Sequence, residues 1–167
     1  MDGVKVALVH ELLTMRGGAE RVLRVLAAMY PDAPIHTLLY DERRLGGWFP
    51  RERVVPSRLQ KWTRFSTNHH LYLRSFPAAA EAWDFSGYDL VISSSSAFAH
   101  GIITNGAPKH LCYVHSPARY LWDRAHDVLA AAGSGPIGWA RRAWLRQTTH
   151  RLRGWGSGAG EPPAARP

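Results

Sequence analysis

Residues 109–117 read KHLCYVHSP, an apolar run that ends on His115 and breaks at Pro117. Two other apolar runs, Val4 to His10 and Asp89 to Ser93, also stop abruptly and are followed by small or polar residues. Runs this continuous are typical of strands that are buried on both faces of a parallel sheet. In such sheets ligands bind outside the carboxyl ends of the strands. We therefore expect one sheet edge to bring together a histidine, a serine cluster and a glycine loop.

The segments between these runs predict helices. Four apolar residues spaced at i, i+3, i+4 and i+7 (Val22, Val25, Leu26, Met29) predict a helix that begins near Gly17-Gly18 and ends before Pro31. A strand at Ile35 to Tyr40 then completes a strand-helix-strand unit. The expected fold class is α/β, a Rossmann-like parallel sheet with helices on both faces. We expect further strands at 53–57, 102–104 and 109–115, a loop at 11–16, and helices at 68–75, 77–83, 94–100 and 118–131.

The length of 167 residues fits one Rossmann-like domain, which we place at residues 1–135, followed by two smaller segments. Residues 136–153 predict a basic amphipathic helix, because Arg142, Arg146, His150 and Arg153 share one face of a helical wheel. Residues 154–167 are rich in Gly and Pro and hold little apolar material, so we expect a disordered tail.

The chain is basic, with a formal net charge of +8. Basic residues lie beside tryptophan and phenylalanine at 48–65 and beside tryptophan at 139–155, a mixture that suits an anionic membrane surface; an ordinary solvated basic face is the alternative. No nucleic-acid reading motif accompanies the charge, so we expect no specific nucleic acid as a partner. No apolar stretch approaches the roughly 20 residues that a membrane span needs. We expect a cytoplasmic protein, peripheral on the inner face of the membrane if the basic segments bind lipid.

Cysteine and histidine spacing bears on redox chemistry and metals. The single cysteine, Cys112, cannot form an internal disulfide, and its apolar surroundings predict a buried thiol in a reducing compartment. His69 and His70 are adjacent, so on a helix they point in different directions, and no cysteine or carboxylate stands at ligand spacing from them. We therefore predict no metal site.

Three motifs follow one another along the chain. They are Val-His-Glu-Leu-Leu-Thr at 9–14 with Gly-Gly-Ala-Glu-Arg-Val-Leu at 17–23, Tyr-Asp-Leu-Val-Ile-Ser-Ser-Ser at 88–95, and Tyr-Val-His-Ser-Pro at 113–117 with Arg119-Tyr120 and Trp122-Asp123. In this order they resemble the amino-terminal half of the family 4 glycosyltransferases, retaining enzymes of the two-domain GT-B fold. The similarity extends from Val4 to about Asp127. Many members of that family have a tryptophan where this chain has Leu12, a departure that concerns packing more than chemistry.

The resemblance implies roles for three residues. Gly17 and Gly18 form the loop for the donor diphosphate, which fits the unpaired N–H groups and the partial positive charge at a helix amino terminus; a simple tight connection is the alternative. His115 is the candidate catalytic residue, near the acceptor or the reacting sugar, because a neutral imidazole accepts or donates a proton near neutral pH. A histidine that only holds its loop by hydrogen bonds is the other reading.

Five more residues are candidates for the acceptor cleft. Ser94 and Ser95 offer hydroxyl groups to a sugar or a phosphate, although serines also cap helices. Arg119 and Asp123 stand four residues apart on an expected helix, where they would pair with each other or orient His115 or the acceptor. His10 ends the first strand and would reach the same cleft or lie satisfied beneath the loop.

The expected function is hexosyl transfer from a nucleoside-diphosphate sugar to a glycan or lipid-linked acceptor, with no metal and no other cofactor. The resemblance implies a second domain that supplies an Arg/Lys pair and two glutamates to the donor site. After Arg141 the chain is rich in Arg, Gly, Ala and Pro instead, so we expect a truncated enzyme without the donor-binding domain, as a frameshift or early stop in a GC-rich gene would produce. A separate polypeptide that supplies this domain is another expectation. The alternative function is a non-catalytic module, derived from such an enzyme, that binds a glycan or a protein.

Overall fold

The fold is built around a five-stranded sheet in which every neighbouring pair of strands is parallel. The structure is a computed structural model that describes residues 3–64, 75–106, 108–115 and 147. The strands run in the order β3-β2-β1-β4-β5. The α/β class with a Rossmann-like parallel sheet is thus confirmed. The strands are β1 (Val6–Leu13), β2 (Ile35–Tyr40), β3 (Val54–Pro56), β4 (Leu90–Ser95) and β5 (Lys109–Val114).

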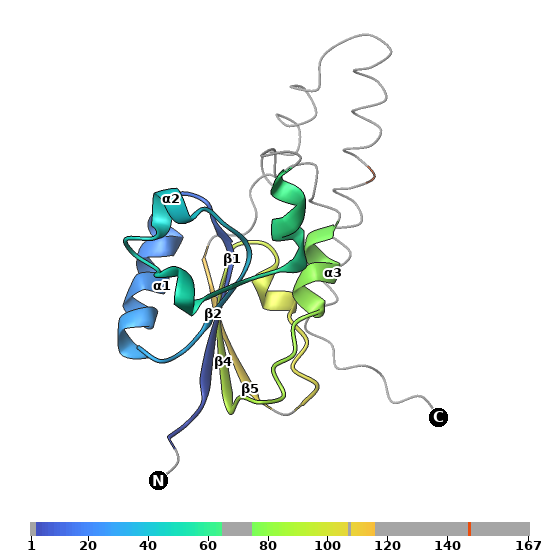
Figure 1. Ribbon diagram of the computed structural model, residues 1–167. Helices are drawn as coiled ribbons and strands as arrows, with labels where there is room; N and C mark the ends of the chain where they lie inside the picture. Colours follow the sequence, from blue (N-terminus) through green and yellow to red (C-terminus); the bar gives the residue numbers. More distant parts are fainter. Residues whose placement is uncertain (1–2, 65–74, 107, 116–146, 148–167) are drawn as a thin grey trace. The chain divides into compact units, whose positions relative to one another are not determined.

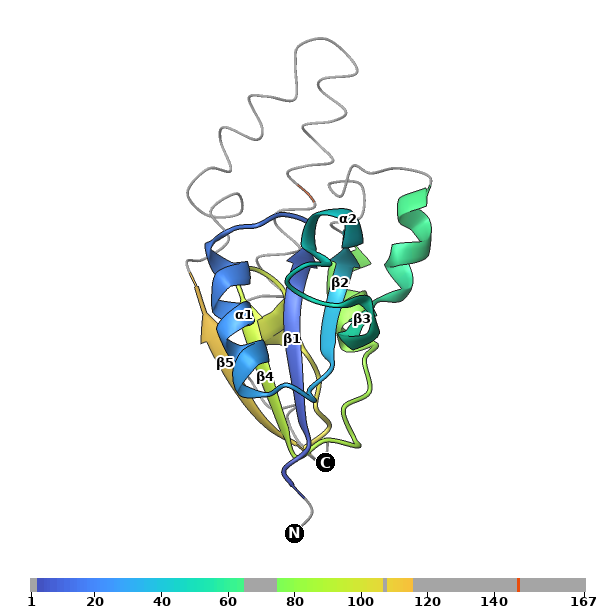
Figure 2. The ribbon, with the colours of Figure 1, turned by 60° about the vertical axis from the view of Figure 1, so that its left-hand side comes forward.

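Helices cover both faces of the sheet. Helix α1 (Gly18–Met29) packs on one face against β1 and β4, whereas α3 (Phe76–Glu81) contacts β2 from the other face (Figures 1 and 2). The short α2 (Glu42–Leu45) follows β2. Three 3-10 turns complete the described elements: η1 (Arg51–Arg53), η2 (Arg58–Arg64) and η4 (Ala99–Gly101). None of the helices in these described residues has the length and apolar character needed to cross a membrane.

The predicted helix after the glycine pair is confirmed, and the core explains its position. The α1 face of the sheet holds a cluster of buried apolar side chains that includes Leu8, Leu23, Ile35 and Ile92. The helix ends at Tyr30, whose N–H donates to the carbonyl of Leu26 just before Pro31. This packing holds the amino terminus of α1 close to the end of β1.

The opposite face carries an aromatic cluster around His36 of β2. The imidazole meets the rings of Trp83, Phe85 and Tyr88 at centroid distances of 5.9, 5.0 and 6.1 Å, all edge to face. Within the described residues neither ring nitrogen of His36 has a hydrogen-bond partner. Burial without a partner penalises the charged imidazole and lowers the pKa of His36 to about 4.

The first strand is longer than predicted. Glu11, expected in a loop, lies inside β1, which continues to Leu13 because pairing with β2 continues as well. The Thr37 hydroxyl of β2 donates to the Glu11 carbonyl at 3.1 Å, and the Asp41 N–H donates to the Leu13 carbonyl at 2.7 Å. Backbone pairing therefore overrides the polar character of this segment.

The predicted helix at 94–100 is wrong for most of its length. Ser94 and Ser95 extend β4 and pair with Tyr113 and Val114 of β5, so only Ala99–Gly101 forms a single 3-10 turn. The strand predicted at 102–104 is also wrong, because these residues form no sheet pairing in the described structure. Ile102 is nevertheless buried, so its apolar character reflects core packing and not a strand.

The strand at 109–114 is present, but it is an edge strand and not a buried one. Leu111, Tyr113 and Val114 are each more than half exposed, and Cys112 is only half-buried, so the prediction of a buried thiol is wrong. The predicted strand at 53–57 and helix at 77–83 are present with shifted ends, at Val54–Pro56 and Phe76–Glu81. The predicted helices at 68–75 and 118–131, the boundary at 135, the basic helix at 136–153 and the tail at 154–167 lie outside the described residues, apart from single positions at 75 and 147.

Candidate functional site

The site lies where the direction of strand succession reverses. Counting outward from β1, the chain first builds β2 and β3 on one side and then β4 and β5 on the other. In open parallel sheets the crevice at the carboxyl ends of the two central strands at this reversal is the usual place for a ligand. Here those strands are β1 and β4, and His10 stands directly opposite Ser94 in their register.

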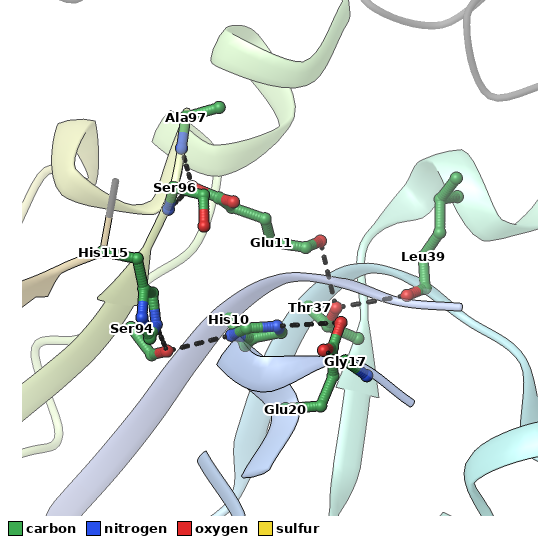
Figure 3. Close-up of polar contacts among 10 residues, drawn as sticks. All are labelled: His10, Glu11, Gly17, Glu20, Thr37, Leu39, Ser94, Ser96, Ala97 and His115. Atoms are coloured by element: carbon green, nitrogen blue, oxygen red, sulfur yellow. Dashed lines mark hydrogen bonds and ion pairs between the residues drawn. The ribbon is translucent and has the colours of Figure 1, made fainter. Parts of the chain in front are cut away.

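A chain of polar side chains spans this reversal point. The Ser94 hydroxyl lies 3.2 Å from Nδ1 of His10 and 2.8 Å from Nε2 of His115, which follows β5 (Figure 3). Ser94 is completely buried and His10 is almost so, whereas His115 is only half-buried. One hydroxyl therefore connects a buried histidine to an accessible one.

Helix α1 contributes Glu20, the last side chain of this polar network. Oε1 of Glu20 lies 3.7 Å from Nε2 of His10, and Oε2 of the same carboxylate accepts the N–H of Gly17 at 2.9 Å. Burial acts to raise the pKa of Glu20, but His10 and the backbone N–H donors outweigh it and hold the pKa below its ordinary value. A charged carboxylate thus occupies the amino terminus of α1.

His115 has the properties of an available proton acceptor. Desolvation and the neighbouring His10 lower its pKa, while Glu11 and Glu20 oppose that effect, so the ring is neutral at pH 7. Its backbone N–H donates to the Ser95 carbonyl at 2.9 Å, and its ring packs edge to face on Tyr113 at 4.9 Å. The backbone and the ring of His115 are therefore both held in place, although the ring is still half-exposed.

The other face of the same two strands carries a second polar network, centred on Glu11. Its Oε1 accepts the Ser95 hydroxyl at 2.8 Å. The same oxygen accepts backbone N–H groups from the turn after β4: Ser96 at 2.8 Å, Ala97, Phe98 at 2.7 Å and Ala99 at 3.2 Å. Glu11 is 8% exposed, so this carboxylate fastens a turn and has little contact with solvent.

Two further histidines bond to the remaining serines. Nε2 of His110 lies 2.8 Å from the Ser93 hydroxyl, and Nδ1 of His100 lies 3.2 Å from the Ser95 hydroxyl. Burial and the nearby His100 lower the pKa of His110. Successive serines of a strand face opposite sides, so Ser94 serves the α1 side while Ser93 and Ser95 serve the other.

An open pocket of about 840 Å³ lies at the carboxyl ends of β1 and β2. Its lining includes acidic, basic and aromatic side chains: Tyr40, Asp41, Glu42, Arg43, Arg44 and Arg51. Asp41 is taken up by Arg44, since their side chains lie 3.4 Å apart. His10, Ser94 and His115 are not among the residues that line it.

The structure joins some predicted site residues and separates others. His10, Ser94 and His115 belong to one network, to which Gly17 is linked through Glu20, whereas Ser95 lies on the opposite face. Gly18 begins α1 and has open space around it. Arg119 and Asp123 lie outside the described residues.

Sequence reasoning missed His100 and His110, which bond to Ser95 and Ser93, and it also missed two glutamates, Glu11 and Glu20. Both glutamates belong to the motifs that were singled out, Val-His-Glu at 9–11 and Gly-Gly-Ala-Glu at 17–20. A glutamate three residues after a helix start is a known signal for a side chain that turns back to the cap, so Glu20 was detectable. Glu11 gave no such signal, because the sequence predicted a loop at 11–16 and not a strand.

Among the described residues no group of three or more His, Cys, Asp or Glu side chains is arranged to hold a metal ion. The network instead suits proton handling: a carboxylate, a histidine and a hydroxyl lead to a second histidine at the surface. No protein-family model matches the chain, and neither the curated proteins nor the solved structures include a significant match.

Proposed function

We propose that residues up to His115 form the acceptor-side domain of a family 4 glycosyltransferase of the GT-B fold, a retaining enzyme that moves a hexose from a nucleoside-diphosphate sugar to a glycan or lipid-linked acceptor. The observation that carries the proposal is the Glu20–His10–Ser94–His115 network at the strand reversal of the sheet. The three motifs that resemble the family contribute these same four residues.

In this proposal His115 is the group that meets the sugar. A half-exposed, neutral imidazole fixed by a buried hydroxyl is suited to accept or donate a proton at a sugar hydroxyl. Ser94 is not a nucleophile, because its hydroxyl is completely buried between two histidines. The reaction therefore needs His115 at the surface and Ser94 beneath it.

The open pocket beside β1 and β2 is our candidate for the rest of the acceptor. Sugar hydroxyls bind well where carboxylates accept hydrogen bonds and guanidinium groups donate them in fixed directions. Glu42, Arg43 and Arg51 supply both kinds of group around a volume of about 840 Å³. A basic margin of this kind also suits an acceptor whose lipid carrier lies in an anionic membrane, which would place the protein at the cytoplasmic face.

A donor diphosphate would compete with a side chain at the amino terminus of α1. A phosphate at the amino terminus of α1 would meet the Glu20 carboxylate, which already accepts the Gly17 N–H. Donor binding at Gly17 and Gly18 therefore requires Glu20 to move away. The cationic side chains of a second domain would supply the remaining charge stabilisation, in place of a metal.

The occupied helix terminus favours one alternative, a non-catalytic module that binds a glycan without a donor. In that case Glu20 stays in place, and the anion site at α1 is filled permanently by the protein itself. The two functions differ in whether nucleoside diphosphates bind.

Saturation-transfer NMR of the full chain distinguishes them. The panel contains nucleoside-diphosphate hexoses, nucleoside diphosphates and short glycans. The matched variants are His115→Ala, just after β5, and Lys109→Ala, at the first residue of β5. The proposal predicts glycan and nucleotide-sugar signals that His115→Ala reduces and Lys109→Ala leaves intact. Glycan signals alone would favour the binding module. No binding in a folded chain, or equal binding by both variants, contradicts the assignment of the site.

A further inference from the structure

In the Glu20–His10–Ser94–His115 network, the hydroxyl of Ser94 limits how the protons are arranged. Ser94 has a single hydroxyl proton but two histidine neighbours, at 3.2 Å and 2.8 Å. It therefore donates to one ring and accepts from the other. The choice made at Ser94 determines which nitrogen of each histidine carries a proton.

Two arrangements are possible when both rings are neutral. In the first, Ser94 donates to Nδ1 of His10, so His10 carries its proton on Nε2 and His115 donates from its own Nε2 to the Ser94 oxygen. In the second, Ser94 donates to Nε2 of His115, and His10 donates from Nδ1 to Ser94. The second leaves the lone pair of His10 Nε2 facing the carboxylate of Glu20.

Glu20 decides between these arrangements. Its Oε1 lies 3.7 Å from Nε2 of His10 in an almost solvent-free position, where a lone pair facing a negative charge is unfavourable. An N–H facing the same carboxylate is favourable. The second Glu20 oxygen is held by the Gly17 N–H, so the carboxylate has a fixed place.

We propose that Glu20, His10 and Ser94 are positioning residues that hold His115 as the Nε2–H tautomer and leave Nδ1 as its accessible proton acceptor. The inference rests on the proposed function for its purpose, since His115 is the group assigned to the sugar. Within the described residues Nδ1 of His115 has no hydrogen-bond partner. The reacting nitrogen is thus Nδ1, and the acceptor hydroxyl approaches the ring on the side away from Ser94.

Within the part of the chain that the structure describes, the groups around His115 come from four elements. They are His10 and Glu11 of β1, Glu20 of α1, Ser94 of β4 and Tyr113 of β5. Glu20 is coupled to His115 through the hydrogen-bonded chain as well as through its charge, and it acts to raise the pKa of His115. Removing that charge should therefore change both the tautomer and the pKa of His115.

Long-range ¹H–¹⁵N correlation spectra of histidine rings in the full, labelled chain read the tautomer directly. At pH 8 we expect the proton of His115 and that of His10 on Nε2; spectra of His115→Ala and His10→Gln assign the two rings. A His115 proton on Nδ1 in the wild-type protein overturns the inference without any further variant.

Variants then test the role of Glu20. Glu20→Gln keeps the size of the side chain and an oxygen for the Gly17 N–H but loses the charge, so we expect a mixture of tautomers at His115 and a lower pKa. Glu52→Gln, which removes an exposed carboxylate from η1 outside both the network and the pocket, should leave both unchanged. Unchanged tautomers in Glu20→Gln contradict the proposal.

Ser94→Ala breaks the connection; if that variant does not fold, Ser94→Cys weakens the connection instead, because a thiol is a weaker hydrogen-bond donor and acceptor than a hydroxyl. In a chain that lacks the Ser94 hydroxyl, Glu20→Gln should have a much smaller effect on the tautomer of His115 than it has in the wild type. The reason is that the effect of Glu20 reaches His115 through this hydroxyl. An undiminished effect would contradict transmission through Ser94. Because these spectra need no sugar, they fail or succeed separately from the glycan-binding experiment.

Discussion

Two glutamates at the same sheet edge are used in opposite ways. The Glu11 carboxylate collects five donors on one oxygen and fastens the turn after β4. The Glu20 carboxylate receives one backbone N–H and faces His10, from which a chain of polar groups leads to the surface. A polar network that ends within the backbone builds structure, whereas one that ends on an accessible imidazole is available for chemistry.

The alternation of a strand produces this division. Ser94 and Ser95 are neighbours in sequence, yet one bonds to His10 and His115 and the other bonds to Glu11. Each serine therefore belongs to a different network on a different face of the sheet. A substitution at one of these positions should affect stability or function, but rarely both.

The largest effect is expected for Glu11→Ala. It removes the acceptor of the Ser95 hydroxyl and of backbone N–H groups from 96 to 99, which are buried or half-buried. We expect the free energy of unfolding to fall by about 4 kcal/mol in urea titrations, because buried donors without acceptors keep their full desolvation cost. Glu52→Ala, at an exposed carboxylate, should change it by less than about 0.5 kcal/mol. Equal losses in the two variants would remove the distinction between the networks.

His36 shows how a buried histidine without hydrogen-bond partners in the described residues affects the free energy of unfolding, in contrast to His10, which bonds to Ser94. The pKa of His36 is about 4 in the folded protein against an ordinary value of 6.5, so the unfolded chain binds a proton first as the pH falls. Its contribution to stability is intact above pH 6.5, and about 3 kcal/mol is lost as the pH approaches 4.

Urea titrations at pH 8, 6 and 4.5 measure this dependence. His36→Phe keeps an aromatic ring among Trp83, Phe85 and Tyr88 but has no titrating group, so its stability should fall less steeply over this range. An identical pH profile in the variant and the wild type would show that His36 is not the group responsible.

The smallest effect concerns the two glycines before α1. A Cβ at Gly17 would lie 2.6 Å from Oε2 of Glu20, whereas nothing lies within 4 Å of one at Gly18. We expect Gly17→Ala to displace the Glu20 carboxylate and to lower the free energy of unfolding by about 1 kcal/mol, as the loss of a cap does. Gly18→Ala should raise it by about 0.5 kcal/mol, since the helix tolerates alanine there. Thermal and urea unfolding of the pair measures both, and the reverse order would contradict the role given to Glu20.

The sheet was largely predictable because its strands are short continuous apolar runs separated by a clear helix. The strand at Ile35–Tyr40 has the predicted ends, and α1 begins and ends where its apolar spacing and Pro31 indicate. The errors at the ends of β1 and β4 share one cause. Polar residues, Glu11 in β1 and Ser94 and Ser95 in β4, continue these strands beyond their apolar runs, because their polar groups are satisfied by partners from distant parts of the chain.

The site was predictable in its residues but not in its connections. His10, Ser94 and His115 follow from the rule that strand ends meet at one edge of a parallel sheet. The separation of Ser94 from Ser95 needed the correct extent of β4, and the bridge to Glu20 needed the packing of α1 on β1. Both depend on tertiary contacts that sequence periodicity does not encode.

Mapping a bound glycan onto the assigned backbone amides tests the central claim most directly. A short glycan that gives a saturation-transfer signal is titrated into the ¹⁵N-labelled chain, and shifts in the amide spectrum locate it. The account predicts shifts that cluster at the network, including His115 and Gly17, and at the open pocket, including Arg43, with none around His36. Shifts confined to the aromatic cluster at His36, or to the far ends of the strands, would contradict the placement of the site.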